Sequence, residues 1–416
     1  MPDMKVMPDR ISYNAAISAC EKGRQWQLAL GLLSSMPDMR VIPNEISYSA
    51  AISACEKGGQ WQVVLSLLSS MVDMRAIPNE ITYNAAISAC EKGGQWQLAL
   101  GLLRSMLDMR AIPNKISYNA AISACEKGGQ WQLALTLLNL MPEATVVPDE
   151  ITYSAAISAC EKGGQWQLAL HLLRLMPEAR VVPNEITYNA AISACSKAGQ
   201  WLLALNLLRL MPEARVAPDV ITYDAAISAC EKGGQWQLAL NLLGLMPEAR
   251  VVPNQITYNA AISACEKGCQ WLLALKLLSL MPEASVVLDQ ISYSAAISAC
   301  EKSGQWQLAL ILLSLMPEAS LVPDQITYNV AISACSKGGQ WQLALKLLRL
   351  MPEARVMPDQ ITYSAAITAC DKAGQWQPAL DLLSLMSEAS VVPDQITYSS
   401  AISACEKTSV CFRWIF

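Results

Sequence analysis

The sequence predicts an all-α, right-handed solenoid of 35-residue helix-turn-helix repeats, and three observations support this fold class. The segment EITYNAAISACEKGGQWQLALGLLRSMLDMRAIPN at residues 80–114 returns with small changes every 35 residues from Arg10 onward. Apolar residues in each copy follow helical spacing, and glycines interrupt most copies near the middle. One such unit cannot bury its apolar faces alone, so neighbouring copies must stack around a continuous core.

The copies follow one another without a break in spacing, which predicts one elongated domain with no linker. We expect residues 1–9 to be the end of a truncated repeat, residues 10–394 to form eleven tandem repeats, and residues 395–416 to form a partial twelfth repeat with a divergent tail. Both ends lack the polar capping repeats that solenoids normally need. We therefore expect the chain to be a piece of a longer protein, so the lack of a visible targeting peptide is uninformative.

The first helix of each copy is predicted from a buried stripe and a glycine stop. Positions are numbered from 1 at Glu80 to 35 at Asn114. Positions 4, 8 and 11 are tyrosine, isoleucine and cysteine in every copy and fall on one helical face. The glycines at positions 14 and 15, here Gly93 and Gly94, are expected to end the helix, because glycine tolerates the left-handed conformation found after helices.

The second helix is predicted to start near position 16 and to carry two apolar sides. We expect it to bury Trp96, Leu103 and Met106 on one side, while further leucines face a second neighbour. In most later copies, a proline at position 28, such as Pro142, is followed by glutamate. This pair predicts that the helix ends there and that a new turn begins at the proline.

The opposite face of the first helix is the candidate binding face. Positions 2, 5, 9 and 12 lie on it, and position 13 lies at its edge. Position 2 is isoleucine in every copy, an apolar group on an otherwise polar face. Position 13 is lysine in every copy, and this one column holds twelve of the 16 lysines. Such lysines either stabilise a solvated helix end through the helix dipole or form a ladder for an anionic partner.

Composition disfavours catalytic, metal-binding and membrane-spanning functions. The only histidine, His171, occupies a variable position and is expected at the surface, which removes the sites that need histidine as a base or ligand. Twelve of the 14 cysteines recur once per copy as small buried residues, and only Cys269 and Cys411 do not. No apolar stretch approaches about 18 residues. We expect no enzyme activity, no metal, no cofactor and no membrane association.

From Met1 to Lys407 the chain resembles the pentatricopeptide repeat family, with repeats of the P type. The resemblance rests on the 35-residue unit, the ITYNAAISAC first helix, the lysine at 13, the LAL-LL second helix with methionine at 27, and proline followed by Asp or Asn at 34 and 35. The related tetratricopeptide repeat has about 34 residues and a different pattern. The resemblance implies recognition of single-stranded RNA, one base per repeat, by side chains of the first helices.

The resemblance also implies a role for four positions. Positions 5 and 35 would select the base, in the pairs Asn14/Asn44, Ser49/Asn79, Asn84/Asn114, Asn119/Asp149, Ser154/Asn184, Asn189/Asp219, Asp224/Asn254, Asn259/Asp289, Ser294/Asp324, Asn329/Asp359 and Ser364/Asp394. Position 2 would sandwich the base, with Ile11, Ile46, Ile81, Ile116, Ile151, Ile186, Ile221, Ile256, Ile291, Ile326 and Ile361. Position 13 would approach the phosphates, with Lys22, Lys57, Lys92, Lys127, Lys162, Lys197, Lys232, Lys267, Lys302, Lys337 and Lys372. Asp or Asn at position 35 is equally suited to cap the next helix, and the two roles are compatible.

By the family's rules, Asn with Asp reads U, Asn with Asn reads C or U, Ser with Asn reads A, and Ser with Asp reads G. The implied target is 5′-YAYUAU-N-UGUG-3′, where the base opposite Asp224 and Asn254 is left open. The net charge of −5 is unfavourable for binding nucleic acid, although eleven acids occupy position 29, away from the candidate face. The ten acids at position 12 lie next to the lysines and weaken the RNA interpretation.

The sequence therefore predicts sequence-specific binding of single-stranded RNA without catalysis, in RNA processing, stability or translation. The resemblance implies a chloroplast or mitochondrial location and other RNA-processing proteins as further partners. The alternative is a protein-binding α-solenoid scaffold that uses the same face. The residues leave the transcript, the outcome of binding and the oligomeric state open.

Overall fold

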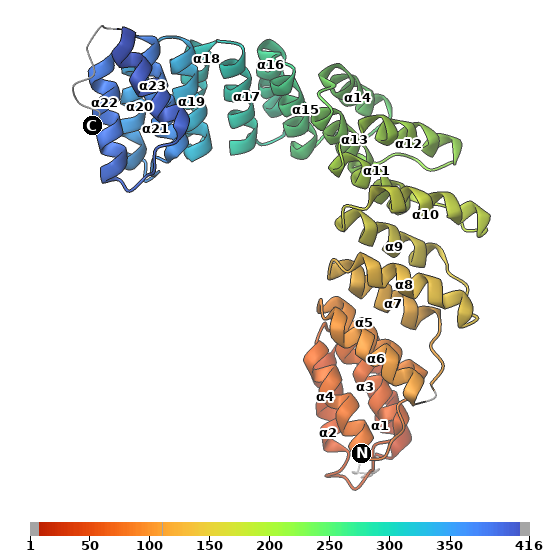
Figure 1. The fold of residues 1–416 in the computed structure, drawn as a ribbon. Coiled ribbons are helices and arrows are strands. Elements are labelled where there is room, and N and C mark those ends of the chain that lie inside the picture. Colours follow the sequence, from red (N-terminus) through yellow and green to blue (C-terminus); the bar gives the residue numbers. More distant parts are fainter. Residues whose placement is uncertain (1–7, 110, 408–416) are drawn as a thin grey trace. The chain divides into compact units, whose positions relative to one another are not determined.

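The computed structural model describes residues 8–109 and 111–407, which fold into 23 α-helices and no strands (Figure 1). The predicted all-α solenoid of helix-turn-helix repeats is confirmed. The first helices of the copies are α1 (Arg10–Lys22), α3 (Glu45–Lys57), α5 (Glu80–Lys92), α7 (Lys115–Lys127), α9 (Glu150–Lys162), α11 (Glu185–Lys197), α13 (Val220–Lys232), α15 (Gln255–Lys267), α17 (Gln290–Lys302), α19 (Gln325–Lys337), α21 (Gln360–Lys372) and α23 (Gln395–Lys407). The second helices are α2 (Trp26–Ser35), α4 (Trp61–Asp73), α6 (Trp96–Asp108), α8 (Trp131–Glu143), α10 (Trp166–Glu178), α12 (Trp201–Glu213), α14 (Trp236–Glu248), α16 (Trp271–Glu283), α18 (Trp306–Glu318), α20 (Trp341–Glu353) and α22 (Trp376–Glu388).

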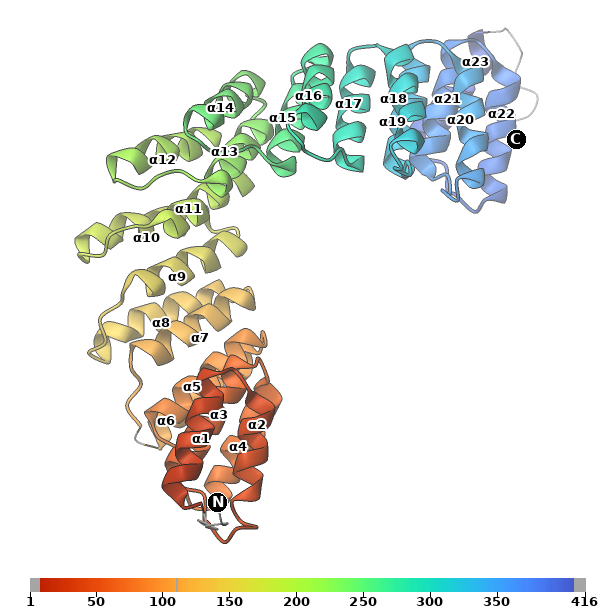
Figure 2. The same ribbon diagram turned by 180° about the vertical axis from the view of Figure 1, so that it is seen from behind.

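Two compact units make up the described chain. Residues up to 198, together with 209–217, form one unit, and residues 199–208, together with those from 218 onward, form the other. Within each unit, a first helix packs against the first helices of the neighbouring copies and against the second helices on either side, as α15 does with α13, α17, α14 and α16 (Figures 1 and 2). None of the described helices combines the length and apolar character needed to cross a bilayer.

Position 35 caps the first helix of the next copy, as predicted. Asn44 Oδ1 accepts the backbone N–H of Ser47 at 3.1 Å, and Ser47 Oγ accepts the backbone N–H of Asn44 at 3.2 Å. This reciprocal arrangement is a capping box, which satisfies two backbone donors at the start of the helix. The same residue therefore ends one copy and fixes the start of the next.

The two glycines of the turn serve different purposes, so the prediction that both favour left-handed backbone is wrong at position 14. Gly94, at position 15, has a φ of +68°, which favours glycine. Gly93, at position 14, has an ordinary φ of −79°. A Cβ added to Gly93 would lie 2.4 Å from Cδ1 of Trp61 in the preceding copy. Position 14 is therefore small because the preceding tryptophan packs against it.

The predicted burial of the tryptophans is only partly right. Ile87, Cys90 and Met106 are completely buried, whereas Trp61 and Trp96 remain partly exposed. Trp61 packs against the edge of the core from its place at the start of α4. Because its ring covers the turn of the next copy and not the centre of the helix pair, one edge still reaches solvent.

In the later copies the second helices run past the proline of position 28, although α2 ends at Ser35, before Pro37. In α8, Pro142 lies inside the last turn and Glu143 is the final helical residue. The helix tolerates this proline because only one backbone donor is lost. Ala144 N–H still donates to the Leu140 carbonyl at 3.0 Å, and Val146 N–H donates to the Met141 carbonyl at 2.8 Å. The end of the helix thus lies one residue beyond the predicted proline.

Candidate nucleic-acid interface

The isoleucine at position 2 is exposed in every copy, as predicted. Ile11 through Ile396 show between 55% and 76% of their surface to solvent. In the second unit, Ile291 and Ile326 line one open hollow, and Ile361 and Ile396 line another. Successive isoleucines therefore bracket these two hollows of the candidate face.

In several copies with asparagine at position 5, this side chain bonds to position 35 of the same copy. Asn119 Nδ2 donates to Asp149 Oδ1 at 3.1 Å, and Asn84 Nδ2 donates to Asn114 Oδ1 at 3.3 Å. Position 5 is less open than expected, because it is half-buried in some copies, such as that of Asn119, and buried in others, where the next first helix leaves Asn84 9% exposed. The pair forms the floor of the candidate face and not its outer surface.

Copies with serine at position 5 differ from this arrangement. Ser49 Oγ donates to the backbone carbonyl of position 1 in its own helix at 2.7 Å, and Ser154 Oγ does the same at 2.6 Å. Among the described residues, Ser49 forms no hydrogen bond with Asn79, and Ser154 forms none with Asn184. The short serine side chain bonds to its own helix and, for Ser49, also to the hydroxyl of Thr82 in the next copy at 2.9 Å. The predicted pairs Ser49/Asn79 and Ser154/Asn184 are therefore separate side chains and not bonded units.

Asn79, Asn184 and Asp219 at position 35 are placed in the structure by their role as helix caps. The Oδ1 atoms of these three residues accept the backbone N–H of position 3 in the following helix, at 3.0, 2.9 and 2.8 Å respectively. Asn184 Nδ2 also donates to Glu150 Oε1. This hydrogen bond occupies the Asn184 amide, the group that is expected to face a base. Of the predicted pair Asn189/Asp219, Asn189 belongs to the first unit and Asp219 to the second. Base reading by these three residues stays a prediction.

A residue that the sequence analysis did not single out holds the asparagine pairs in place. Position 3 is Ser or Thr in every copy, and its hydroxyl can reach position 5 of the preceding copy. Thr152 Oγ1 donates to Asn119 Oδ1 at 2.6 Å, and Thr362 Oγ1 does the same to Asn329 at 2.6 Å. The hydroxyl occupies the oxygen of the asparagine amide, and position 35 accepts one of its N–H groups. The amide is therefore held in one orientation and keeps one N–H donor for a ligand. The presence of Ser or Thr at position 3 in every copy is the sequence feature that could have predicted this contact.

The eighth repeat departs from this pattern. Asn259 Nδ2 donates to both carboxylate oxygens of Asp289, at 3.2 and 3.0 Å. Ser292 Oγ donates to the Asp289 backbone carbonyl at 2.8 Å. Among the described residues, buried Asn259 Oδ1 has no hydrogen-bond partner. This amide is less firmly held than the others.

The unusual pair of the seventh repeat places a carboxylate where other copies have an amide or hydroxyl. Thr257 Oγ1 donates to Asp224 Oδ1, and Asn254 Nδ2 donates to Asp224 Oδ2 at 3.1 Å. Burial raises the pKa of the Asp224 carboxyl in spite of these two hydrogen bonds. When ionised, this group offers only acceptors to a ligand.

Position 1 contacts the outward-facing atom of position 35, a second feature that sequence reasoning missed. Asn114 Nδ2 donates to Glu80 Oε1, and Lys115 Nζ lies 3.1 Å from Asp149 Oδ2. Burial opposes ionisation of Asp149, but hydrogen bonds from Thr152 and Lys115 outweigh it and lower the pKa of this carboxyl. A charged position 1 therefore competes with any ligand for position 35.

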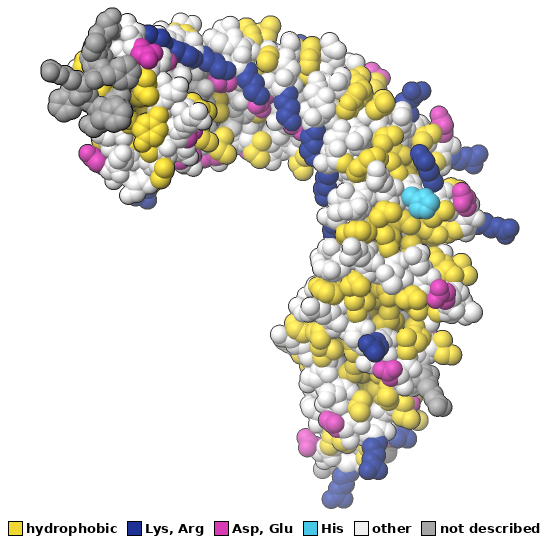
Figure 3. All heavy atoms as spheres, viewed as in Figure 1, with side chains coloured by type: hydrophobic (Ala, Val, Ile, Leu, Met, Phe, Trp, Pro, Cys, Tyr) yellow, Lys and Arg dark blue, Asp and Glu magenta, His cyan; other side chains and the backbone are white. Residues whose placement is uncertain are grey.

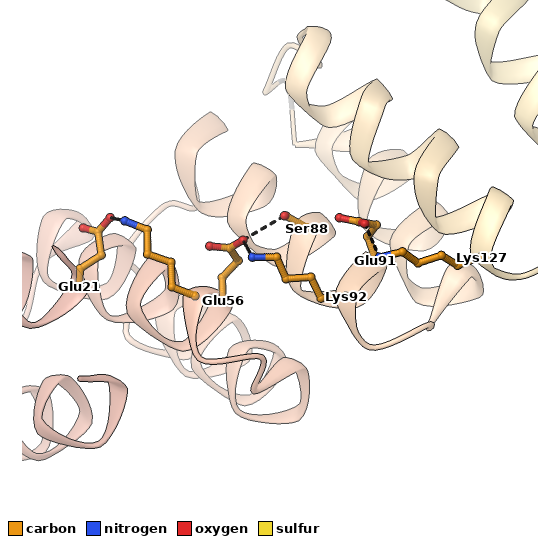
Figure 4. Close-up of polar contacts among 7 residues, drawn as sticks. Glu21, Glu56, Ser88, Glu91, Lys92 and Lys127 are labelled. Atoms are coloured by element: carbon orange, nitrogen blue, oxygen red, sulfur yellow. Dashed lines mark hydrogen bonds and ion pairs between the residues drawn. The ribbon is translucent and has the colours of Figure 1, made fainter. Parts of the chain in front are cut away.

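The lysine column is a series of ion pairs between copies. Lys92 Nζ lies 2.5 Å from Glu56 Oε1, and Lys127 Nζ lies 2.6 Å from Glu91 Oε1 (Figure 4). Ser88 Oγ donates to the same Glu56 oxygen at 3.1 Å (Figure 4). In the described chain nine lysines pair in this way with position 12 of the preceding copy, namely Lys57, Lys92, Lys127, Lys162, Lys197, Lys267, Lys302, Lys337 and Lys407. The acids counted against RNA binding thus neutralise most of the column, a part of which is visible as a row of basic side chains over the second unit (Figure 3).

No described part of the chain brings three possible metal ligands together. His171 is exposed, as predicted. Burial raises the pKa of fully buried position-11 thiols, such as Cys90 and Cys265, to about 11, which leaves them protonated and unreactive at neutral pH. Cys269 is exposed, and Cys411 lies outside the described residues.

Comparison with solved structures shows similarity to the pentatricopeptide repeat protein PPR10 from maize, with 19% identity over 97% of this chain and 72% of that chain and a TM-score of 0.50. PPR10 in complex with an 18-nucleotide psaJ RNA element matches with 20% identity over 97% of this chain and 73% of that chain, at a TM-score of 0.47. The PPR domain of protein-only RNase P 1 from Arabidopsis thaliana, in complex with tRNA, matches with 16% identity over 43% of this chain and 94% of that chain, at a TM-score of 0.39.

Comparison with curated protein sequences gives no match. Family models, however, match most of the chain. The model of the PPR repeat family matches residues 8–57, 78–127, 113–162, 183–232, 218–267, 288–337 and 323–372, and that of the PPR repeat matches residues 46–75, 151–181 and 256–286. These matches follow the 35-residue period and the helix pairs described above, and the chain therefore belongs to the pentatricopeptide repeat (PPR) family.

Proposed function

We propose that this chain binds single-stranded RNA in a sequence-specific manner, one base per repeat, without catalysis. The observation that carries the proposal is the floor of the candidate face, where positions 5 and 35 lie between isoleucines of successive copies in two hollows and are bonded to each other in copies such as that of Asn119 and Asp149. Membership of the PPR family supports the same function. A single copy of this arrangement would carry little weight, but its recurrence with a fixed period suits a polymer with regularly spaced bases.

The hollow between α17 and α19 illustrates how a base would be held. Ile291 and Ile326 flank it, Ser294 and Asp324 line it, and its volume is about 410 Å³. An unstacked base in this hollow would lay its apolar faces against the isoleucines and remove them from water. Its hydrogen-bonding edge would then face the pair from positions 5 and 35.

The chemistry of position 35 accounts for the choice of base. A carboxylate at this position has an outward oxygen that accepts the ring N–H of U or G. An amide can turn its Nδ2 outward and donate to the ring nitrogen of C or A, which carries no hydrogen. A small serine at position 5 leaves room for a purine, whereas asparagine fills that space and favours a pyrimidine. These rules give the target 5′-YAYUAU-N-UGUG-3′ for the eleven reading pairs.

We further propose that the bound RNA is a chloroplast or mitochondrial transcript, and that binding affects its processing, stability or translation, together with other RNA-processing proteins. Family membership supports this role. A protein-binding scaffold is the second candidate, and the neutralised lysine column favours it, because nine ion pairs reduce the attraction of this edge for phosphate.

The proposal is tested by measuring the affinity of the chain for three RNAs at the same salt concentration. These are the single-stranded target, a scrambled strand of the same composition, and the target as a duplex. We expect the single-stranded target to bind tightest, because the isoleucine hollows accept only unpaired bases. Equal affinity for all three, or no binding to any of them, contradicts the proposal and favours the scaffold.

A further inference from the structure

We infer that Lys372 in the eleventh repeat is a dominant phosphate anchor of the second unit and that most of the other lysines in the column contribute little. This inference rests on the proposed RNA binding and adds where the RNA backbone is held most strongly. It follows from a substitution at position 12 and from the comparison of two hollows that carry the same reading pair.

The acid that neutralises the column is missing before Lys372. Position 12 of the tenth repeat is Ser336, whereas ten of the twelve copies carry an acid there. In the same unit, Lys302 lies 2.9 Å from Glu266 and Lys337 lies 2.9 Å from Glu301. Within the described chain, Lys372 forms no ion pair, and its side chain is exposed.

Lys372 also lies beside a hollow that is built like a base site. Ile361 and Ile396 flank this hollow of about 390 Å³, and Ser364 and Asp394 line it as the reading pair. A ligand in the hollow would therefore meet two apolar surfaces, one selecting pair and one unneutralised ammonium group. This combination matches a nucleotide, with its base between the isoleucines and its phosphate at the rim.

The ninth repeat provides a natural control within the same unit. Its hollow has the same isoleucine bracket and the same pair of Ser and Asp, here Ser294 and Asp324. Glu266 lines this hollow and holds Lys302, whereas Lys337 and Lys372 line the hollow of the eleventh repeat. The two sites therefore differ chiefly in the charge at the rim, and both are expected to read G.

The physical consequence is an unequal response to salt. A phosphate near Lys302 meets an ammonium and a carboxylate, so the attraction and the repulsion largely cancel. A phosphate near Lys372 meets an unpaired ammonium and displaces a counterion, which contributes about −0.7 to the log-log salt slope for a single strand. Full engagement of ten lysines would give roughly −7. The chain is expected to show a much shallower slope, since Ser196, before Lys232, is the only other serine at position 12.

The test compares Lys372→Gln with the matched control Lys302→Gln, using the single-stranded target over a range of salt concentrations. We expect Lys372→Gln to weaken binding roughly fivefold at about 0.1 M salt and to reduce the slope by about 0.7. Lys302→Gln should change the affinity less than about twofold, because Lys302 is already paired with Glu266 and its contact with a phosphate would release few counterions. Equal effects of the two substitutions overturn the inference.

The reciprocal exchange tests the same point without removing a lysine. Ser336→Glu should reproduce the loss seen for Lys372→Gln, and Glu266→Ser should tighten binding and steepen the slope. The fold should accept the new glutamate, since Glu301 occupies the equivalent position at 9% exposure. No change of slope in either variant overturns the inference. If the unaltered chain binds no single-stranded RNA at all, the proposed function itself fails, and this outcome is distinct from equal losses in the two lysine variants.

Discussion

Two isoleucine columns run through the first helices, and their environments are opposite. Position 8 is fully buried from Ile17 to Ile367, as in Ile297 at 0% exposure, whereas position 2 is open, as in Ile291 at 61%. Burial explains the first column, because each side chain stabilises the core. Packing within the chain does not explain the second column, which recurs on an otherwise polar face. The difference shows that one isoleucine of each repeat stabilises the fold, and it supports the proposal that the other contacts a ligand.

The largest expected effect is on the buried column. Ile297→Ala should lower the free energy of unfolding by about 2 to 5 kcal/mol, because it leaves a cavity between helices that pack closely. Chemical denaturation followed by circular dichroism measures this change. A loss below about 1 kcal/mol would show that the site collapses around the alanine and would blur the distinction between the two columns.

The open column should respond in the opposite way. Ile291→Ala should change the free energy of unfolding by less than about 0.5 kcal/mol, because the side chain is already in water. The same substitution should weaken binding of the RNA target by about 1 to 2 kcal/mol, since a base loses part of its apolar contact.

A matched control for Ile291 is Val322, which is 70% exposed and lies at position 33, outside the candidate face. Val322→Ala should leave both stability and RNA affinity unchanged. Equal losses of affinity in the two variants would mean that general surface hydrophobicity, and not the isoleucine column, governs binding.

Position 5 lies between the two columns. The smallest expected effect is there, at Asp224, and it is a change of stability with pH. Because burial raises the pKa of Asp224, the folded chain disfavours its ionised form. The stability linked to this group is present below the unfolded pKa of about 3.9 and is lost as pH rises through the raised pKa. Asp224→Asn should therefore be more stable than the parent at pH 7 and equal to it near pH 3. Thermal melting at both pH values measures this, and equal melting at pH 7 would contradict it.

The repeated sequence predicted the elements of the fold well. Each first helix runs from position 1 to position 13 and is capped by position 35, and the positions of tyrosine, isoleucine and cysteine marked the core in advance. The exposure of position 2 also followed from helical spacing. These features depend only on residues within one copy, so helical periodicity was sufficient to predict them.

Helical periodicity within one copy did not predict the contacts between copies. The packing of Trp61 against Gly93, the hydroxyl of Thr152 on Asn119 and the pairing of lysines with the preceding acids all join residues about one repeat apart. They depend on how far one copy is rotated and shifted against the next, which no single copy encodes in its own pattern. The sequence shows that Ser336 replaces an acid, but the effect of this replacement on Lys372 depends on the pairing between copies.

Asn259→Ser tests most directly whether position 5 helps to select a base. Asn259 with Asp289 should prefer U, and the substitution creates the pair of Ser and Asp found at Ser294 and Asp324. The test measures affinities for the four RNA variants at this one position before and after the substitution. The substitution should shift the preference from U toward G by about 1 to 3 kcal/mol. Preferences at neighbouring bases should not change. A profile that stays the same at the eighth base would contradict base reading at position 5, whatever happens to the overall affinity.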